Sequence, residues 1–110
     1  MEFTGPVDQV PERIAGPAVA VLREALANVA RHAAATEVSI RLHAGADALD
    51  VVVSDNGKGP GAAPPGDGIT SILTRAGRLG GSATVTAGEG GGTVVDWRVP
   101  LPARASAQPA

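Results

Sequence analysis

One segment of the sequence joins a buried strand to residue types that can bind a ligand. From Asp50 to Gly61, three consecutive valines are followed by Asp55, an amide and three glycines. A carboxylate at a strand end can accept hydrogen bonds from an exocyclic amine, and glycines beyond it let a flat ligand approach the main chain. A purely structural turn is the alternative, because Asn56-Gly57 is a strong hairpin signal and Asp favours side-chain turns.

A second polar cluster lies on a segment with helical periodicity. Glu24, Asn28 and Arg31 are spaced by four and three residues, which places them on one face of a helix. A carboxylate and an amide oxygen side by side suit a hard cation such as Mg²⁺, which is held by few protein groups together with phosphate oxygens and water. Arg31 beside them can neutralise phosphate charge. The alternative is an ordinary solvated face, although flanking alanines make this stripe narrow.

The third cluster is Gly66-Asp67-Gly68, which precedes a second helical pattern. Main-chain N–H groups at a helix N-terminus form an anion site when glycines leave them accessible. Plain loop flexibility explains the same glycines, so this cluster is a weak signal by itself.

Composition excludes several classes of protein. The chain lacks cysteine, which excludes disulfides and thiolate metal ligands. It has only two histidines, so we expect no zinc site. The net charge is −2 without a basic cluster, so we expect no nucleic-acid partner. No apolar run approaches the roughly 20 residues that span a bilayer, so we expect no membrane contact. We expect a cytoplasmic location, which the absence of cysteine fits.

The elements that position the three clusters follow from apolar periodicity. Strands alternate and helices repeat every three to four residues, which predicts a helix after Gly16-Pro17 with a core face of Leu22, Ala25, Leu26, Val29 and Ala33. The predicted elements in order are an edge strand 2–4, a helix 18–34, strands 36–45 and 46–55, a loop 57–68, a helix 69–81, and strands 82–88 and 93–101. This order predicts an α+β fold, a two-layer sandwich with a mostly antiparallel sheet and helices on one face. We expect one domain over residues 1–102 and a disordered tail over 103–110.

This element order also decides between the two interpretations of the turn at Asn56-Gly57. A hairpin needs a second strand directly after the turn. Residues 58–68 are loop-like instead and lead into a helix, so the hairpin interpretation fails.

The three clusters, in this order, resemble a known family. "REALANVARHA" resembles the N box of the GHKL superfamily of ATPases, "DNGKG" its first glycine box and "GDGI" its second. Residues 68–102 resemble the C-terminal half of the catalytic and ATP-binding domain of sensor histidine kinases. The subgroup that it resembles pairs with response regulators that carry helix-turn-helix output domains. The resemblance covers residues 17–102 and implies the GHKL α/β sandwich.

The resemblance implies a role for each cluster, with ATP and Mg²⁺ bound between them. It implies that Asp55 binds the adenine amino group and that Asn28 ligates Mg²⁺. Glu24 takes the position of a general base, and Arg31 approaches a phosphate. It also implies that Gly57 and Gly59 shape the adenine pocket and that Thr93 supports the carboxylate. The phosphates are faced by Gly66, Gly68 and the N–H of Ile69, and residues 60–66 form the lid over ATP.

The resemblance also implies partners and leaves alternatives. Such kinases phosphorylate a histidine on a separate dimerisation domain, which hands the phosphoryl group to a response regulator. His32 belongs to the N box and is not that acceptor. The GDGI box departs from the subgroup's GxGL, so a degenerate nucleotide-binding module is one alternative. An anti-sigma-factor serine kinase of the same superfamily is another.

Overall fold

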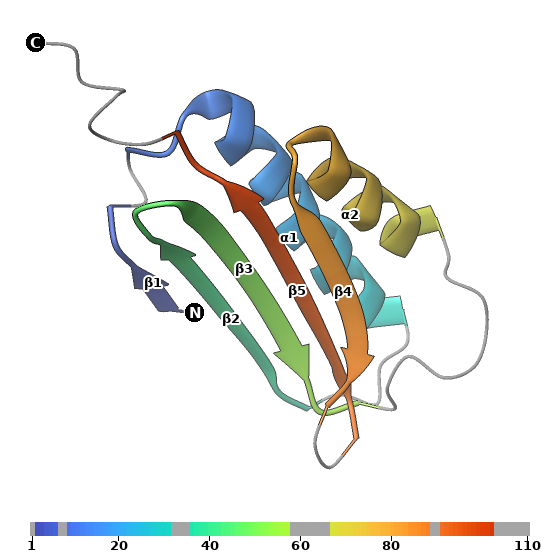
Figure 1. Ribbon diagram of the computed structural model, residues 1–110. Coiled ribbons are helices and arrows are strands. Elements are labelled where there is room, and N and C mark those ends of the chain that lie inside the picture. Colours follow the sequence, from blue (N-terminus) through green and yellow to red (C-terminus); the bar gives the residue numbers. More distant parts are fainter. Residues whose placement is uncertain (1, 7–8, 32–35, 58–66, 89–90, 103–110) are drawn as a thin grey trace, which may run out of the picture.

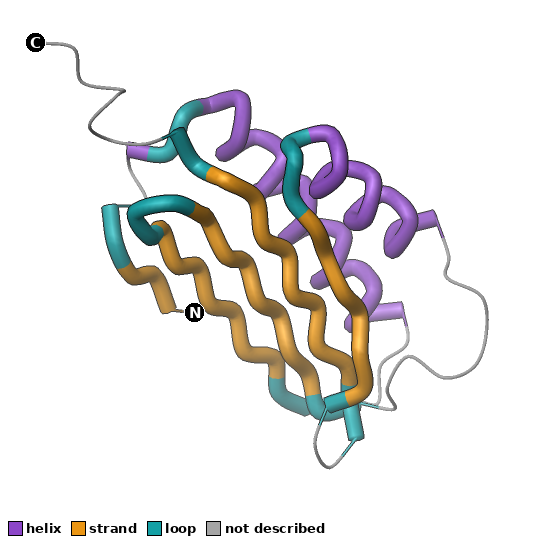
Figure 2. Tube along the Cα trace, viewed as in Figure 1, coloured by secondary structure: helices purple, strands orange, loops and turns teal. Residues whose placement is uncertain are grey.

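The alternating segments of the sequence form a single five-stranded sheet in the computed structural model, which describes residues 2–6, 9–31, 36–57, 67–88 and 91–102. Two helices cover one face of this sheet (Figures 1 and 2). The elements are β1 (Glu2–Thr4), α1 (Glu12–Arg31), β2 (Val38–Ala44), β3 (Ala48–Asp55), α2 (Asp67–Arg78), β4 (Ser82–Ala87) and β5 (Thr93–Pro100). The predicted α+β sandwich with helices on one face is therefore confirmed. The predicted tail lies outside the described residues.

The strand order in space is β1-β2-β3-β5-β4. β2 pairs antiparallel with β3, and β5 pairs antiparallel with both β3 and β4. Among the described strands, β1 alone is parallel to its neighbour, β2. The strand that comes last among them in sequence, β5, thus lies inside the sheet, and β4 forms one edge.

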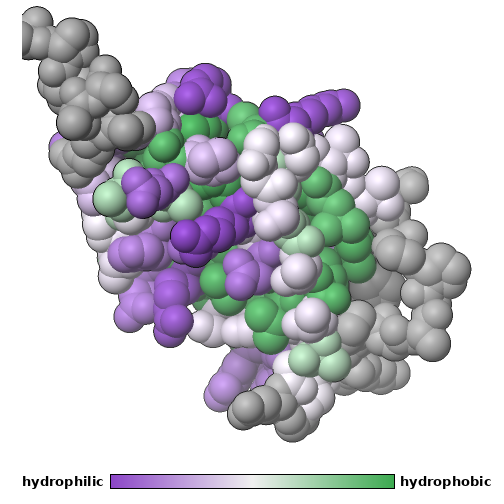
Figure 3. Space-filling model, viewed as in Figure 1, coloured by the Kyte–Doolittle hydropathy of each residue, from purple (hydrophilic) through white to green (hydrophobic). Residues whose placement is uncertain are grey.

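Alternation along the three central strands builds the core. Val51 and Val53 of β3 and Trp97 of β5 are at most 2% exposed and face the helices. Their neighbours in sequence point to the other face, where Arg98 contacts Asp50 at 3.3 Å. Figure 3 shows hydrophilic residues gathered on this uncovered face, over β1, β2 and β3. The two faces therefore differ in polarity, as an antiparallel sheet with one solvated face requires.

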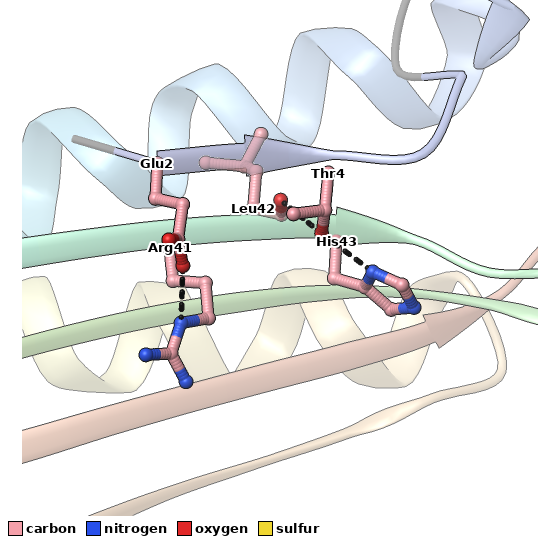
Figure 4. A network of polar contacts seen from close by, with 5 residues as sticks. All are labelled: Glu2, Thr4, Arg41, Leu42 and His43. Carbon is pink, nitrogen blue, oxygen red and sulfur yellow. Dashed lines mark hydrogen bonds and ion pairs between the residues drawn. The ribbon is translucent and has the colours of Figure 1, made fainter.

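β1 is attached to β2 by side chains as well as by main-chain pairing. Glu2 and Arg41 form an ion pair at 3.0 Å, and the hydroxyl of Thr4 lies 2.6 Å from Nδ1 of His43 (Figure 4). Both Glu2 and Arg41 are more than half exposed, so their ion pair contributes about 0–1 kcal/mol to the free energy of unfolding. His43 therefore has a structural partner on the uncovered face.

α1 begins earlier than predicted and presents a different face to the core. It starts at Glu12, so Pro17 lies in its second turn rather than its first. Pro17 has no N–H to give to the carbonyl of Arg13, but the helix continues because its buried face extends back beyond the proline. That face consists of Ile14, Ala18, Val21 and Ala25, each at most 3% exposed.

The predicted core face of α1 is wrong at Leu26, which is 37% exposed. Leu22 and Val29 are half-buried, and Ala33 lies outside the described residues. The prediction missed Ile14 because it took Pro17 as the start of the helix.

α2 begins at Asp67, two residues before the predicted start, and buries Ile72 and Ala76. The predicted glycine stop is confirmed. Gly80 has φ +78°, Gly81 N–H donates to the Ala76 carbonyl at 2.8 Å, and Gly80 N–H donates to the Gly77 carbonyl at 3.1 Å. These two bonds form a Schellman motif. Within the described residues, neither helix is long and apolar enough to cross a membrane.

Candidate functional site

Asp55 ends β3 on the face of the sheet that the helices cover. It shares the parity of Val51 and Val53, so its side chain projects toward the helical layer, and it is half-buried. Its Oδ1 accepts a hydrogen bond from the N–H of Gly57 at 2.8 Å. The side-chain turn considered as an alternative for Asp55 is therefore present. This turn uses only Oδ1, and within the described residues no side chain donates to Oδ2 of Asp55.

β5 begins beside this turn. Ser54 pairs with Val94, which places Thr93 opposite Asp55 and on the same face of the sheet. Gly92, with φ +80°, lies against the main chain of Asp55, and a Cβ there would overlap the Asp55 carbonyl oxygen. Only glycine combines this φ with this contact. The register therefore places Thr93 beside Asp55, and its role behind the carboxylate stays a prediction.

Asn56 attaches the same turn to the segment that leads into β2. Its Oδ1 accepts from the main-chain N–H groups of Thr36 at 2.8 Å and Glu37 at 3.0 Å. Its Nδ2 donates to the Thr36 hydroxyl at 2.9 Å. The sequence showed Asn56 only as a turn former, because its partners are about twenty residues away.

The polar stripe of α1 borders the core rather than facing away from it. Glu24 and Asn28 are both half-buried and lie on the flank of the buried face formed by Val21 and Ala25. Leu26 lies on the opposite flank, because residues advance by about 100° each around a helix. Arg31 is the last residue of α1, and its side chain lies outside the described part of the chain.

The first turn of α2 contains Gly68 and Ile69. Unpaired N–H groups at such a turn carry a partial positive charge. Gly59, Gly66 and the predicted lid 60–66 lie outside the described residues.

The fold brings four of the expected parts to one side of the molecule. α1 runs behind the sheet toward the end at which β3 finishes and β5 starts (Figure 1). α2 packs on α1 and runs back, so its N-terminal end lies on the side where α1 ends. The described parts are the α1 stripe, the Asp55 turn, the start of β5 and the first turn of α2.

Comparison with known proteins agrees with this arrangement. Residues 15–103 match the family described as histidine kinase-, DNA gyrase B- and HSP90-like ATPases. The chain belongs to this family. As an ATPase domain of this kind it is homologous to two curated proteins of Bacillus subtilis, the sensor histidine kinases LiaS and YxjM.

The ATPase domain is 37% identical to LiaS over 84 residues, which is 74% of this chain and 23% of LiaS. It is 31% identical to YxjM over 91 residues, or 83% of this chain and 22% of YxjM. It therefore spans less than a quarter of each relative. The solved blue-light activated histidine kinase EL346 of Erythrobacter litoralis superposes with a TM-score of 0.72 at 28% identity, over 96% of this chain and 36% of that one.

An open hollow of about 710 Å³ adjoins the Asp55 turn of the ATPase domain. Its lining includes Asp55, Asn56 and Gly91, together with Ser39 and Ser54. The two serines point to the uncovered face by alternation, so the hollow extends onto that face. The end of β3 is thus accessible from the uncovered side of the sheet.

The described part of the ATPase domain offers few groups to a metal ion. Among its described residues, no three His, Cys, Asp or Glu side chains gather into a metal site. A Mg²⁺ ion that keeps several waters and phosphate oxygens needs only one or two protein ligands. Asn28, half-buried on α1 four residues after Glu24, has a side chain whose chemistry fits such a site.

Proposed function

We propose that this ATPase domain binds ATP with Mg²⁺ and donates the γ-phosphoryl group to a histidine on a separate dimerisation domain, in two-component signal transduction. One observation carries the proposal. The carboxylate of Asp55 stands at a strand end on the helix-covered face, with one oxygen fixed by Gly57 N–H at 2.8 Å. That arrangement leaves the second oxygen for a ligand amine.

At the adenine end, Asp55 accepts a hydrogen bond from the exocyclic amine. A carboxylate suits this contact because it has only acceptors. Gly57 and Gly59 leave space for the ring, and Thr93 supports the carboxylate from β5. The close packing of Gly92 on the Asp55 main chain supports this assignment, since it fixes where the carboxylate starts.

At the phosphate end, Asn28 holds Mg²⁺ and Arg31 approaches a phosphate oxygen. The ion, when bound, neutralises phosphate charge. Gly68 and the N–H of Ile69 face the phosphates from the start of α2, where N–H groups favour anions, and we assign Gly66 to the phosphates as well. Support comes from the half-buried position of Asn28 on the flank of α1.

In the transfer step, a nitrogen of the acceptor imidazole attacks the γ-phosphorus in line. The N–P bond forms as the bond to the β-phosphate oxygen breaks, and ADP leaves. The residues of this chain contribute position and charge neutralisation, which dominate phosphoryl transfer. Glu24 accepts the imidazole proton as a general base.

The partners are a dimerisation domain that carries the acceptor histidine and a response regulator that receives the phosphoryl group from it. The resemblance to sensor kinases supports both, because such kinases carry the first and transfer the phosphoryl group to the second. We propose a regulator with a helix-turn-helix output domain, following the resemblance of residues 68–102.

Two measurements test this function. Isothermal titration of the 110-residue chain with ADP, and with ATP at varied Mg²⁺, should show binding of both. A supplied dimerisation domain of a related kinase should then gain labelled phosphate from ATP on histidine. Absence of nucleotide binding would identify a degenerate module, and labelling of a serine on a protein partner would favour the anti-sigma-factor kinase.

A further inference from the structure

Asn56 makes three side-chain hydrogen bonds to the segment that leads into β2, yet the proposed function gives it no task. Its amide bonds to Thr36 N–H, Glu37 N–H and the Thr36 hydroxyl at 2.8, 3.0 and 2.9 Å. Its own N–H also donates to the Glu37 carbonyl at 3.3 Å. We propose that Asn56 is a positioning residue that sets the Asp55 carboxylate for adenine, an inference that rests on the proposed nucleotide site.

The location of Asn56 in the chain connects it to that carboxylate. It lies between Asp55 and Gly57, the two residues joined by the side-chain turn. A displacement of Asn56 therefore moves both the carboxylate and the N–H that orients it. Gly92 packs on one side of this turn, and Thr36 with Glu37 holds the other. The turn is thus held by two segments outside it, one that leads into β2 and one that leads into β5.

The geometry requires particular chemistry at position 56. The side-chain oxygen must accept two N–H bonds, and the nitrogen donates to a hydroxyl. Asp retains both acceptors, and the Thr36 hydroxyl can rotate to donate to it. Ala removes all three bonds and leaves two main-chain N–H groups to solvent. Asn56→Asp is therefore the conservative variant, and Asn56→Ala the disruptive one.

The position of Asn56 also predicts which part of a nucleotide is affected. Asp55 contacts adenine in the proposed site, whereas Asn28 and Arg31 contact metal and phosphates from α1. A loosened Asp55 turn should weaken every adenine ligand by the same factor, with or without Mg²⁺. A change transmitted through α1 should instead grow with the number of phosphates and with Mg²⁺.

The experiment compares dissociation constants of ADP without Mg²⁺ and ATP with Mg²⁺ for the wild-type chain and four variants. Asn56→Ala should weaken both ligands by about tenfold, the ratio that corresponds to about 1.4 kcal/mol. Asn56→Asp should restore affinity to within about threefold of the wild type, since its acceptors remain. Thr36→Val removes a single bond, so its affinities should lie between those of the two Asn56 variants. It provides a second test if Asn56→Ala does not fold.

Ile40→Val serves as the control for loss of stability. Ile40 is 8% exposed in β2 and touches none of the bonds of Asn56, so its shortening should lower stability while leaving both affinities unchanged. Unchanged affinities in Asn56→Ala and Thr36→Val, or a loss confined to Mg²⁺-ATP, would overturn the positioning role. Failure of the wild-type chain to bind either nucleotide would instead overturn the proposed function, so the two failures are distinguishable.

Discussion

Gly92 lies directly against the carbonyl of Asp55, so the start of β5 and the end of β3 are in contact with no side chain between them. The φ of +80° at Gly92 is one that L-residues rarely adopt, and an added Cβ would also meet the Cα of Asn56 at 3.0 Å. The close contact thus depends on glycine at position 92, which has no side chain.

Gly92→Ala should destabilise the fold by more than about 2 kcal/mol, because the left-handed φ and the overlap each add a cost. It should also weaken ADP binding, since the Asp55 turn must move. Gly77→Ala is the matched control, because a Cβ there meets nothing within 4 Å and Gly77 lies inside α2. That change should stabilise the protein by roughly 0.5–1 kcal/mol. Urea unfolding of the two variants measures the contrast, and a Gly92→Ala variant as stable as wild type would contradict it.

Asp55→Asn should weaken ADP binding by about 100-fold or more. The amide presents an N–H where the ligand amine needs an acceptor, and a buried donor left unpaired adds its own cost. Titration calorimetry measures the loss. Asp50→Asn is the control, because Asp50 lies on the same strand but on the uncovered face, paired with Arg98. Equal affinities of Asp55→Asn and wild type would exclude the adenine contact.

Asn28→Ala should retain ADP binding without Mg²⁺ but reduce the gain in ATP affinity on adding Mg²⁺ by about tenfold. The loss should be specific because adenine is held by β3, not by α1. Arg23→Ala on the exposed side of α1 is the control. If the Mg²⁺ dependence of Asn28→Ala equals that of wild type, the ion is held elsewhere.

Glu24→Gln should bind Mg²⁺-ATP as the wild type does but transfer phosphate to a supplied dimerisation domain about 10²–10⁴ times more slowly. The amide preserves shape and removes the base. Transfer of labelled phosphate over time measures the effect, with Glu12→Gln in the exposed first turn of α1 as the control. Full transfer by Glu24→Gln would assign the base to the acceptor domain.

Ile72→Ala should lower the free energy of unfolding by about 2–5 kcal/mol, because Ile72 is 0% exposed and its loss leaves a cavity. Leu73→Ala, one residue further along α2, should change it by only about 0.5 kcal/mol, since Leu73 is 40% exposed. The buried Trp97 provides the fluorescence signal for both measurements. Similar losses in the two variants would mean that the exposed face of α2 is covered in solution.

The fold was largely predictable because each strand has its own alternation and each helix its own apolar repeat. Val51 and Val53 marked the buried face of β3, and Gly80-Gly81 marked the end of α2. The start of α1 was missed because Pro17 resembles a first-turn proline, while Ile14 before it continues the buried face. Local patterns cannot decide whether the helix starts at Pro17 or before it. The burial of Ile14 stabilises the earlier turn by more than the proline inside the helix costs.

The candidate site was predicted in its residue types but not in its connections. Asp55, Asn28 and Glu24 were recognisable from their positions in motifs, and their ligand contacts remain predictions. The bonds of Asn56 to Thr36 and the packing of Gly92 on Asp55 were not predictable. They join segments far apart in the chain, and no local spacing signals such a contact.

The place of β5 between β3 and β4 fixes the order in which the protein can be completed during synthesis. A nascent chain that ends before Thr93 has β3 and β4 but no strand to join them, so its sheet remains divided. Pairings between distant segments form slowly, because the loop must close before any bond forms. The proposed site gains Gly92 and Thr93 only with this last strand. Nucleotide should therefore bind only fragments that extend beyond β5, and ADP retention by ribosome-released fragments of increasing length would reveal that threshold.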